Sequence, residues 1–346
     1  MSNTQSSVSR PIIDVKDLVE VYADGTKAVD GVSFNVEKGE FFGFLGPNGA
    51  GKSTTIKVLT TLLRKTSGSI SIAGYDIDKD PVAIRKLIGV QSQDTSVDPE
   101  LTGRENMILQ GNLQQMHGKE LKERVEQLLE VVGLKDAADK RAGRYSGGMK
   151  KRLDLASTLV HKPTVLFLDE PTTGLDPQSR ATVWEYLEGL NKKEGITIFL
   201  TTQYLEEADR LCERLCIVDS GKIVAEGTPS DLKREIGADA ISISMKNKQG
   251  RSDETVKAAA REIVSKMPEV VNVLDSGDGL TIYAKEGGYF IPELVRAFDK
   301  TDIALVSINL STPSLDDVFL KHTGKRIRVE ELVKDTTSGR FGGRRR

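Results

Sequence analysis

One glycine-rich octapeptide restricts the possible folds of this chain more than any other segment. It matches the pattern G-x-x-x-x-G-K-[ST] and consists of Gly46, Pro47, Asn48, Gly49, Ala50, Gly51, Lys52 and Ser53. A short apolar run, residues 39–46, leads into it, and a helical pattern follows to about residue 63. A strand, a glycine-rich loop and a helix in this order direct backbone N–H groups and a helix N-terminus at one place, where a phosphate binds. Since a chance match in a chain of this length is on the order of one per cent, the octapeptide predicts an α/β fold around a phosphate-binding loop.

Strand-like and helix-like segments alternate on both sides of this loop. Residues 12–21 carry apolar residues in the short runs typical of strands. Residues 164–170 and 196–202 are each centred on an apolar run, as in strands buried on both faces of a sheet. Residues 104–161 have a helical pattern. One apolar helix face in this stretch comprises Leu121, Val125, Leu128, Leu129 and Val132. The alternation favours an α/β domain with a largely parallel sheet.

A second series of strand-like and helix-like segments begins beyond residue 236. A strand, a helix, two strands, a helix and a strand follow one another, with a turn expected at 276–279 and a last helix before Gly324. The order β-α-β-β-α-β is that of the ferredoxin-like, α+β arrangement. We therefore expect four parts: a disordered lead (1–10), an α/β domain (11–235), a small α+β domain (236–324) and a flexible basic tail (325–346).

Composition and charge exclude several classes of protein. The 49 Lys and Arg residues almost balance 51 Asp and Glu residues, which argues against a protein that grips nucleic acid over its whole surface. No apolar run approaches the roughly 18–20 residues of a membrane-spanning helix, and the polar start lacks a secretory signal, so we expect a cytosolic chain. Cys212 and Cys216, four residues apart, are expected on one buried helix face and not in a disulfide or zinc site.

Two carboxylates end one of the expected buried strands. Residues 165–168 are apolar, and Asp169 and Glu170 follow directly. Parallel strands place functional residues at their carboxyl ends, beside the phosphate loop. There Asp169 and the Ser53 hydroxyl would hold Mg²⁺, and Glu170 would be the general base that orients and polarises an attacking water. Lys52 would place its cation on the β- and γ-phosphates.

A third motif identifies a family. It consists of Tyr145, Ser146, Gly147, Gly148 and Met149, and a basic helical segment follows it. Ser146 lies 94 residues after Lys52 and 23 residues before Asp169. This order of phosphate loop, helical insert, Ser-Gly-Gly motif and acidic strand resembles that of the ABC-transporter ATPases. Their signature usually reads LSGGQ, and this chain keeps its Ser-Gly-Gly centre while the outer residues differ.

The resemblance implies a P-loop NTPase fold with a RecA-like core, an antiparallel β part and an α-helical subdomain. It also implies that two ATP molecules with Mg²⁺ are bound in a head-to-tail dimer, where the signature motif of one subunit reaches the ATP of the other. The residues carried over from the family are Tyr22 for stacking on adenine, Thr54 for the nucleotide, Gln93 for Mg²⁺ and the γ-phosphate, and Asp176 for the dimer interface.

Two glutamine positions require a separate argument. Gln91 is an alternative to Gln93, but alignment on the preceding Ile88-Gly89 favours Gln93. The family usually has a switch histidine after the strand expected at 196–202, and this chain has Gln203 there. Its amide can donate a hydrogen bond to a phosphate but cannot take up a proton near neutral pH. Gln203 is therefore limited to positioning, and the general base must be Glu170.

The segments YSGGM, TTQYLEEAD and PSLDDVFLKHTG narrow the resemblance to drug- and antibiotic-resistance exporter ATPases of the daunorubicin-resistance type. Such proteins carry an accessory C-terminal domain, whose expected role here is structural or dimer-supporting. The resemblance implies a second ATPase subunit, a separate membrane permease contacted by residues 93–105, and no nucleic-acid partner. The chain would then lie at the cytoplasmic face of the membrane as a peripheral subunit and drive efflux of drugs, antibiotics or lipid-like molecules.

Two other classes remain as alternatives. Non-transport ABC proteins that act on ribosomes or nucleic acid usually carry two ATPase cassettes or long coiled-coil inserts, and this chain has neither. A P-loop GTPase needs an N/T-K-x-D motif to read its base, and the nearest match, residues 191–194, ends in Glu. Neither the cargo nor the direction of transport follows from the residues themselves.

Overall fold

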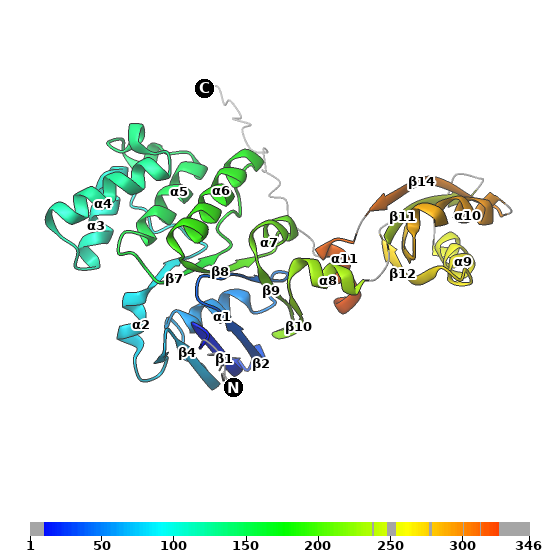
Figure 1. The fold of residues 1–346 in the computed structure, drawn as a ribbon, viewed down its shortest axis with the longest axis horizontal. Coiled ribbons are helices and arrows are strands. Elements are labelled where there is room, and N and C mark those ends of the chain that lie inside the picture. Colours follow the sequence, from blue (N-terminus) through cyan, green and yellow to red (C-terminus); the bar gives the residue numbers. More distant parts are fainter. Residues whose placement is uncertain are drawn as a thin grey trace, which may run out of the picture.

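The computed structural model describes residues 10–236, 239–247, 254–276, 279–299, 301–311 and 313–324. The expected lead up to residue 9, the basic tail and the centre of the turn at 276–279 lie outside these ranges. Among the described residues, no helix is both long and apolar enough to cross a membrane. Figure 1 shows a large body that contains the first two sheets and a smaller one that contains the third.

A six-stranded sheet forms the centre of the large body, in the order β10-β9-β3-β8-β7-β6. Its strands are β3 (Phe41–Leu45), β6 (Ile88–Gln91), β7 (Val165–Asp169), β8 (Thr197–Thr202), β9 (Arg214–Asp219) and β10 (Lys222–Gly227). All neighbours pair in parallel except β9 and β10. Every residue of β3, β7 and β8 is buried, so the prediction of buried parallel strands is confirmed.

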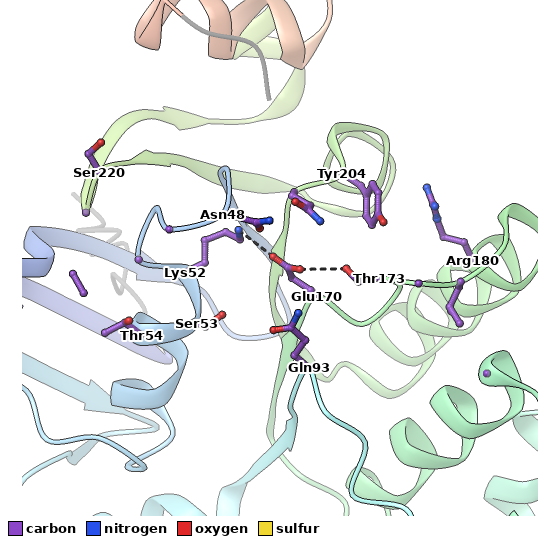
Figure 2. Close-up of a pocket in the computed structure, with 18 of the residues that line it drawn as sticks. Asn48, Lys52, Ser53, Thr54, Gln93, Glu170, Thr173, Arg180, Tyr204 and Ser220 are labelled. Atoms are coloured by element: carbon purple, nitrogen blue, oxygen red, sulfur yellow. Dashed lines mark hydrogen bonds and ion pairs between the residues drawn. The ribbon is translucent and has the colours of Figure 1, made fainter. Parts of the chain in front are cut away.

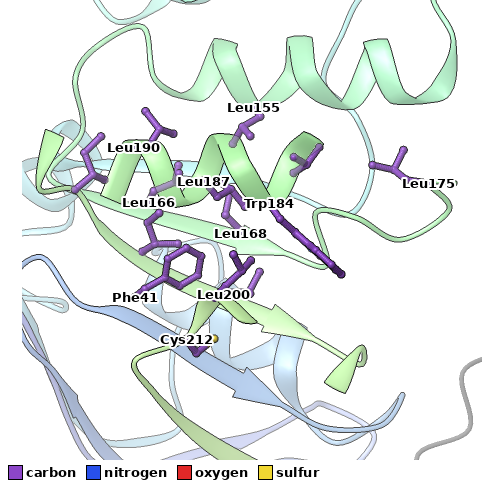
Figure 3. Packing of buried hydrophobic residues seen from close by; sticks show 14 of the residues in the cluster. Phe41, Leu155, Leu166, Leu168, Leu175, Trp184, Leu187, Leu190, Leu200 and Cys212 are labelled. Carbon is purple, nitrogen blue, oxygen red and sulfur yellow. The ribbon is translucent and has the colours of Figure 1, made fainter. Parts of the chain in front are cut away.

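Helices cover both faces of this sheet. They are α1 (Lys52–Leu59), α6 (Pro177–Glu194) and α7 (Leu205–Leu211). Figure 3 shows how Trp184, Leu187 and Leu190 of α6 lie over Leu166 and Leu168 of β7. This packing buries the apolar face of α6, and it fixes the direction from which its N-terminus approaches the carboxyl ends of the strands.

A second, antiparallel sheet has the order β2-β1-β4-β5. It is built from β1 (Ile13–Val21), β2 (Lys27–Val36), β4 (Ser67–Ile72) and β5 (Tyr75–Asp76), and α2 (Pro81–Leu87) follows it. Phe34 of this sheet lies between Phe42, Phe44 and Phe199 of the central sheet, with ring centroids 5.5 to 5.7 Å apart. Aromatic rings at such separations attract one another and exclude water, and they fasten the two sheets together.

The expected helical stretch contains α3 (Gly103–Leu113), α4 (Gly118–Val131), two short 3-10 turns, η1 (Lys135–Ala137) and η2 (Ala142–Arg144), and α5 (Gly147–Thr158). The apolar residues expected on one helix face, Leu121, Val125, Leu128, Leu129 and Val132, are all buried along α4 and at its C-terminal end. The antiparallel sheet, the parallel core and this helical part together confirm the P-loop ATPase fold expected from the resemblance.

The smaller body also has the expected order. It contains β11 (Asp239–Asn247), α9 (Glu254–Ser265), β12 (Val270–Ser276), β13 (Gly279–Ala284), α10 (Gly287–Asp299) and β14 (Ile303–Ser311), and the sheet order is β12-β13-β11-β14. All pairs are antiparallel, as in a ferredoxin-like sheet. The last helix, α11 (Leu315–Thr323), returns to the large body and packs against α7 and α8 (Pro229–Glu235), as Figure 1 shows. Tyr283 of β13 donates a buried hydrogen bond of 2.7 Å to Asp317 of α11.

Two predictions about local structure were wrong, and one strand was missed. Cys212 and Cys216 are buried but do not share a helix face, because α7 ends before Cys212 and Cys216 lies in β9. The helix after the phosphate loop ends at Leu59, four residues early, where the Thr60 hydroxyl donates to the Ile56 carbonyl and the chain turns into the left-handed region at Thr61. The sequence analysis also missed β6, whose four residues are too few for a clear pattern.

Candidate active site

The strand ends and the helical part together line one open cavity of about 1470 Å³. Figure 2 shows its centre, with the phosphate loop on one side and the N-terminal end of α6 on the other. Most predicted site residues line this cavity, and they are Tyr22, Asn48, Gly49, Gly51, Lys52, Ser53, Thr54, Gln93, Ser146, Gly147, Gly148, Glu170, Asp176 and Gln203. Segments from the whole length of the large body therefore meet at one place.

The backbone of the phosphate loop requires glycine at Gly49 and Gly51. Both have positive φ values, 81° and 97°. A Cβ atom on Gly51 would lie 2.3 Å from the Ala28 carbonyl oxygen, so no larger residue fits there. Gly46 is equally restricted, because a Cβ would lie 2.4 Å from the Val218 carbonyl oxygen. These constraints hold the loop in a tight turn ahead of α1, whose free N–H groups then face the cavity.

Lys52 is the first residue of α1, and its ammonium group is buried and fully engaged. It donates to the carbonyl oxygens of Gly46 at 2.9 Å and Pro47 at 3.1 Å. It also pairs with Glu170 Oε1 at 3.1 Å, and both side chains are less than a tenth exposed. Figure 2 shows this pair at the centre of the site. The ammonium group therefore lies where it can bind a phosphate, between the loop and the carboxylate.

Ser53 and Asp169 provide the oxygen donors that a magnesium ion prefers. The Ser53 hydroxyl donates to Asp169 Oδ1 at 3.2 Å, and the Thr201 hydroxyl donates to the same oxygen at 2.6 Å. Gln93 lines the cavity close by, and Figure 2 shows it on the side of Glu170 away from Asn48. Hydroxyl, carboxylate and amide oxygens form a donor set that fits Mg²⁺. Gln91, the alternative to Gln93, lies buried in β6.

Glu170 is held by hydrogen bonds to both its backbone and its side chain. Its backbone N–H donates to the Thr201 carbonyl oxygen at 3.1 Å, and its Oε2 accepts from the Thr173 hydroxyl at 3.2 Å. Its φ of 49° lies in the left-handed region, which is uncommon for a residue other than glycine and is strained. The strand therefore ends in a fixed bend that directs this carboxylate at the cavity.

Gln203 follows β8 and is 5% exposed. The neighbouring strand end is bonded to the phosphate loop, because Gly46 N–H donates to the Thr202 carbonyl oxygen at 3.2 Å. Tyr204 follows Gln203 in the chain, and the Arg180 guanidinium lies 4.2 Å from the centre of its ring. Arg180 and Tyr204 also line the cavity, and the sequence analysis missed both because neither carries a motif of its own.

The signature motif and Asp176 lie at two exposed helix N-termini. Ser146 is the N-cap of α5 and accepts from the Met149 N–H. Asp176 is the N-cap of α6, and its two hydrogen bonds from Ser179 lower the pKa of the Asp176 carboxyl. A Cβ atom on Gly148 would lie 2.8 Å from the Ser179 hydroxyl, so the two helix starts are close neighbours. Free N–H groups at both ends favour an anion.

The segment around Gln93 is fastened to α5 by residues that the sequence analysis missed. Asp154, 2% exposed, accepts from the backbone N–H and hydroxyl of Ser96 and from the Gln91 amide. Lys151 donates to the Gln93 carbonyl oxygen at 2.8 Å, and burial lowers the pKa of this lysine. The helix that begins at the signature motif therefore also holds the loop that carries Gln93.

Tyr22 lies at the edge of the cavity, 36% exposed, at the end of β1. Its hydroxyl and that of Thr54 share a hydrogen bond of 2.9 Å. This bond fixes the ring beside α1, with a face available for stacking on a base. Of the predicted loop residues, Pro47 contributes its carbonyl to Lys52, and Ala50 is buried with its own carbonyl accepting from the Gly221 N–H.

Comparison with known proteins agrees with this fold. The family model for ABC transporters matches residues 29–173, and that for the C-terminal domain of DrrA1-3-like ATP-binding proteins matches residues 227–323. The daunorubicin/doxorubicin resistance ATP-binding protein DrrA of Streptomyces peucetius is 42% identical over 90% of this chain and 92% of its own. A Nod factor export ATP-binding protein of Burkholderia thailandensis is 40% identical over 89% of this chain and 96% of its own.

Solved structures of ATP-binding cassettes have a similar fold. A dimeric ATP-binding cassette in a post-hydrolysis state, bound to ADP and Pi, matches with a TM-score of 0.58 and 27% identity, over 62% of this chain and 98% of its own. Fold and site thus define a nucleotide-binding ATPase of the cassette type. The chain belongs to the ABC transporter ATP-binding proteins, in the branch with a DrrA-like C-terminal domain.

Proposed function

We propose that this chain is the ATP-hydrolysing subunit of an exporter, in which two copies bind two ATP molecules head to tail and drive a separate membrane permease. The exported molecules would be drugs, antibiotics or lipid-like compounds, because relatives about 40% identical are named for drug resistance and for Nod factor export. The chain would act from the cytoplasmic face of the membrane as a peripheral subunit. We propose residues 11–235 as its ATPase domain and 236–324 as its accessory domain.

The proposed chemistry assigns one task to each group around the cavity. Lys52 and the loop N–H groups bind the β- and γ-phosphates, and Glu170 takes the proton from the attacking water as general base. Mg²⁺, when bound, would neutralise charge on the phosphate oxygens, held by Ser53, Asp169 and Gln93. Gln203 orients the γ-phosphate through its amide N–H groups and holds no proton.

Binding of phosphate would also change the state of Glu170. In this structure its carboxylate is paired with Lys52 at 3.1 Å. A triphosphate would compete for the same ammonium group, since a phosphate carries more negative charge than a carboxylate. Glu170 would then be free to accept a proton from water only after the nucleotide has entered.

One observation carries the proposal of a head-to-tail dimer. On the phosphate-loop side, Lys52 and Glu170 are buried and paired with each other, whereas Ser146, Gly147 and Asp176 on the opposite side are exposed. Two helix N-termini with exposed N–H groups are suited to receive a phosphate that another copy presents. This arrangement supports a site completed by the Ser-Gly-Gly motif of the second chain.

Mixing two inactive variants tests this dimer. Lys52→Ala removes the phosphate-binding cation, and Ser146→Arg blocks the exposed helix N-terminus, so each variant alone is expected to be inactive. Co-expression gives mixed dimers in which one of the two sites has both intact halves. We expect recovery of roughly one quarter of wild-type turnover, because half of the dimers are mixed and each has one site. A mixture as inactive as its components contradicts the shared site.

Partner capture tests the transport role. We expect the full chain to co-purify from membranes with a protein that contains several membrane-spanning helices, and its ATP turnover to rise with the molecule exported. Quantitative recovery of an active chain bound to ribosomes or nucleic acid would instead favour the non-transport class.

A further inference from the structure

One buried carboxylate lies behind the wall of the cavity and has no role in the chemistry proposed above. Glu207, in the first turn of α7, is 0% exposed. Its Oε1 accepts one hydrogen bond of 2.8 Å from the Thr172 hydroxyl and a second of 2.8 Å from the Trp184 indole N–H. Its Oε2 is buried with no hydrogen-bond partner among the residues that the structure describes. Burial of a carboxyl group costs considerable free energy, which the two bonds to Oε1 offset in part, so this position is a specific polar site within an apolar core.

The partners of Glu207 belong to the segments that carry the proposed catalytic groups. Thr172 lies in the loop directly after Glu170. Trp184 lies in the second turn of α6, the helix that begins at Asp176. The third neighbour is Thr202, whose hydroxyl accepts from the Tyr204 N–H and thereby shapes the backbone on either side of Gln203.

The electrostatics of Glu207 agree with this geometry. Burial raises the pKa of the Glu207 carboxyl, and the Thr202 hydroxyl, the Trp184 indole and the Thr172 hydroxyl oppose that rise. The charge of Arg180, which lines the cavity, lowers the same pKa. Hydrogen bonds accepted by one oxygen do not require a negative charge on the group, since an amide oxygen also accepts them, with less strength than a carboxylate.

We propose that Glu207 is a positioning residue for ATP hydrolysis, which holds the loop of Glu170 and the segment of Gln203 in one fixed arrangement. The inference rests on the proposed roles of these two residues. The chain bends at Glu170, whose φ of 49° is strained, and the Thr172–Glu207 bond holds the loop that follows from the side away from the cavity. Displacement of a catalytic group by about 1 Å is enough to slow a reaction on the order of 100-fold.

Three variants of the full chain test this role. Glu207→Leu removes both accepted hydrogen bonds, Glu207→Gln keeps an oxygen that accepts them, and Thr172→Val removes one donor without a change of shape. Glu206 is exposed and adjacent on the same helix, so Glu206→Leu and Glu206→Gln are matched controls. We measure kcat and KM for ATP by phosphate release, nucleotide binding, and thermal unfolding.

A positioning role has a definite pattern of outcomes. We expect kcat of Glu207→Leu to fall about tenfold or more with KM for ATP within about twofold, because binding groups on the phosphate loop stay in place. Glu207→Gln should keep most of the turnover, and Thr172→Val should lose several-fold. A folded Glu207→Leu with wild-type kcat overturns the proposal, as does a Glu207→Gln variant that is as slow as Glu207→Leu.

Two further measurements keep the test decisive. If Glu207→Leu does not fold, Thr172→Val and Trp184→Phe each remove one donor, and an unchanged kcat in both variants overturns the proposal. Glu170→Gln separates this inference from the proposed catalytic base. Turnover lost in the Glu207 and Thr172 variants but retained in Glu170→Gln would refute the base role and keep the positioning role.

Discussion

The two sides of the cavity differ in how complete they are. On the phosphate-loop side, Lys52, Asp169 and Glu170 are nearly buried and already have partners. Lys52 pairs with Glu170 and with a backbone carbonyl, and Asp169 accepts from the Thr201 hydroxyl. On the opposite side, Ser146 and Asp176 are exposed, and their side chains only cap their own helices. The first side is therefore preorganised within one chain, whereas the second offers exposed helix N-termini to a ligand that comes from elsewhere.

This difference indicates which step of the reaction each side of the cavity affects. Buried charges with fixed partners act in a medium of low dielectric, where small displacements have large effects on a charged transition state. Exposed N-caps interact more weakly and are screened by salt. Substitutions on the buried side should therefore change the chemical step, and those on the exposed side should change assembly of the complete site.

The largest effect is expected on the buried side, from Glu170→Gln. The substitution keeps the shape of the side chain but removes the carboxylate that we propose as general base, and loss of a general base slows a reaction by about 10²- to 10⁴-fold. ATP binding should survive, because Lys52 and the phosphate loop are unchanged. Steady-state phosphate release and equilibrium nucleotide binding check both statements.

The control for this experiment is Glu213→Gln, an exposed carboxylate between α7 and β9. It should have wild-type turnover. Retained turnover in Glu170→Gln would refute the assignment of the base, and it would mean that the buried side only binds nucleotide.

An intermediate effect is expected on the exposed side, from Ser146→Ala. The Ser146 hydroxyl caps α5 by accepting from the Met149 N–H, and loss of such a cap destabilises a helix start by about 1 kcal/mol. We expect turnover at low protein concentration to fall about fivefold, with recovery at higher concentration because dimer assembly is weakened. If turnover falls equally at every protein concentration, Ser146 acts in the chemical step and not in dimer assembly. The two sides of the cavity would then not differ in the step that they affect.

The sequence predicted the residues of the buried side of the cavity better than the contacts that hold them in place. Lys52, Asp169 and Glu170 were predictable because each lies in a motif whose spacing fixes its place beside a strand end. Three sets of contacts were not predictable. They are the Lys52–Glu170 ion pair, the hydrogen bonds from Ser96 to Asp154, and the hydrogen bonds to Glu207. Each joins side chains from distant segments, and only the packed fold decides that these segments meet.

The errors have the same physical origin. The spacing of Cys212 and Cys216 suits a helix, yet the chain enters β9 between them, because pairing with β3 at Phe42–Leu45 outweighs the local pattern. The short strand β6 is stabilised by pairing with β7 and not by its own four residues. Local signals therefore predicted many of the residues that line the cavity, but not the contacts that support them.

The smallest effect is expected from Gln203→His, which tests whether the buried side needs a proton at the switch position. Gln203 is 5% exposed and lines the cavity beside the strand end that is bonded to Gly46. A histidine ring donates a hydrogen bond from one nitrogen just as the amide does, so turnover near neutral pH should stay within about threefold of wild type. The difference lies in pH dependence, since histidine titrates near pH 6.5 and glutamine does not titrate.

We therefore expect the wild-type pH profile to lack any contribution from position 203, and the Gln203→His profile to gain one between about pH 6 and 7. The profile of kcat, measured at saturating ATP, checks this. An imidazole beside the γ-phosphate is stabilised in its charged form, which moves the added step toward higher pH, whereas burial moves it lower. Inactivity of Gln203→His at every pH would show that this site requires the amide itself, and that the preorganisation of the buried side extends to the switch residue.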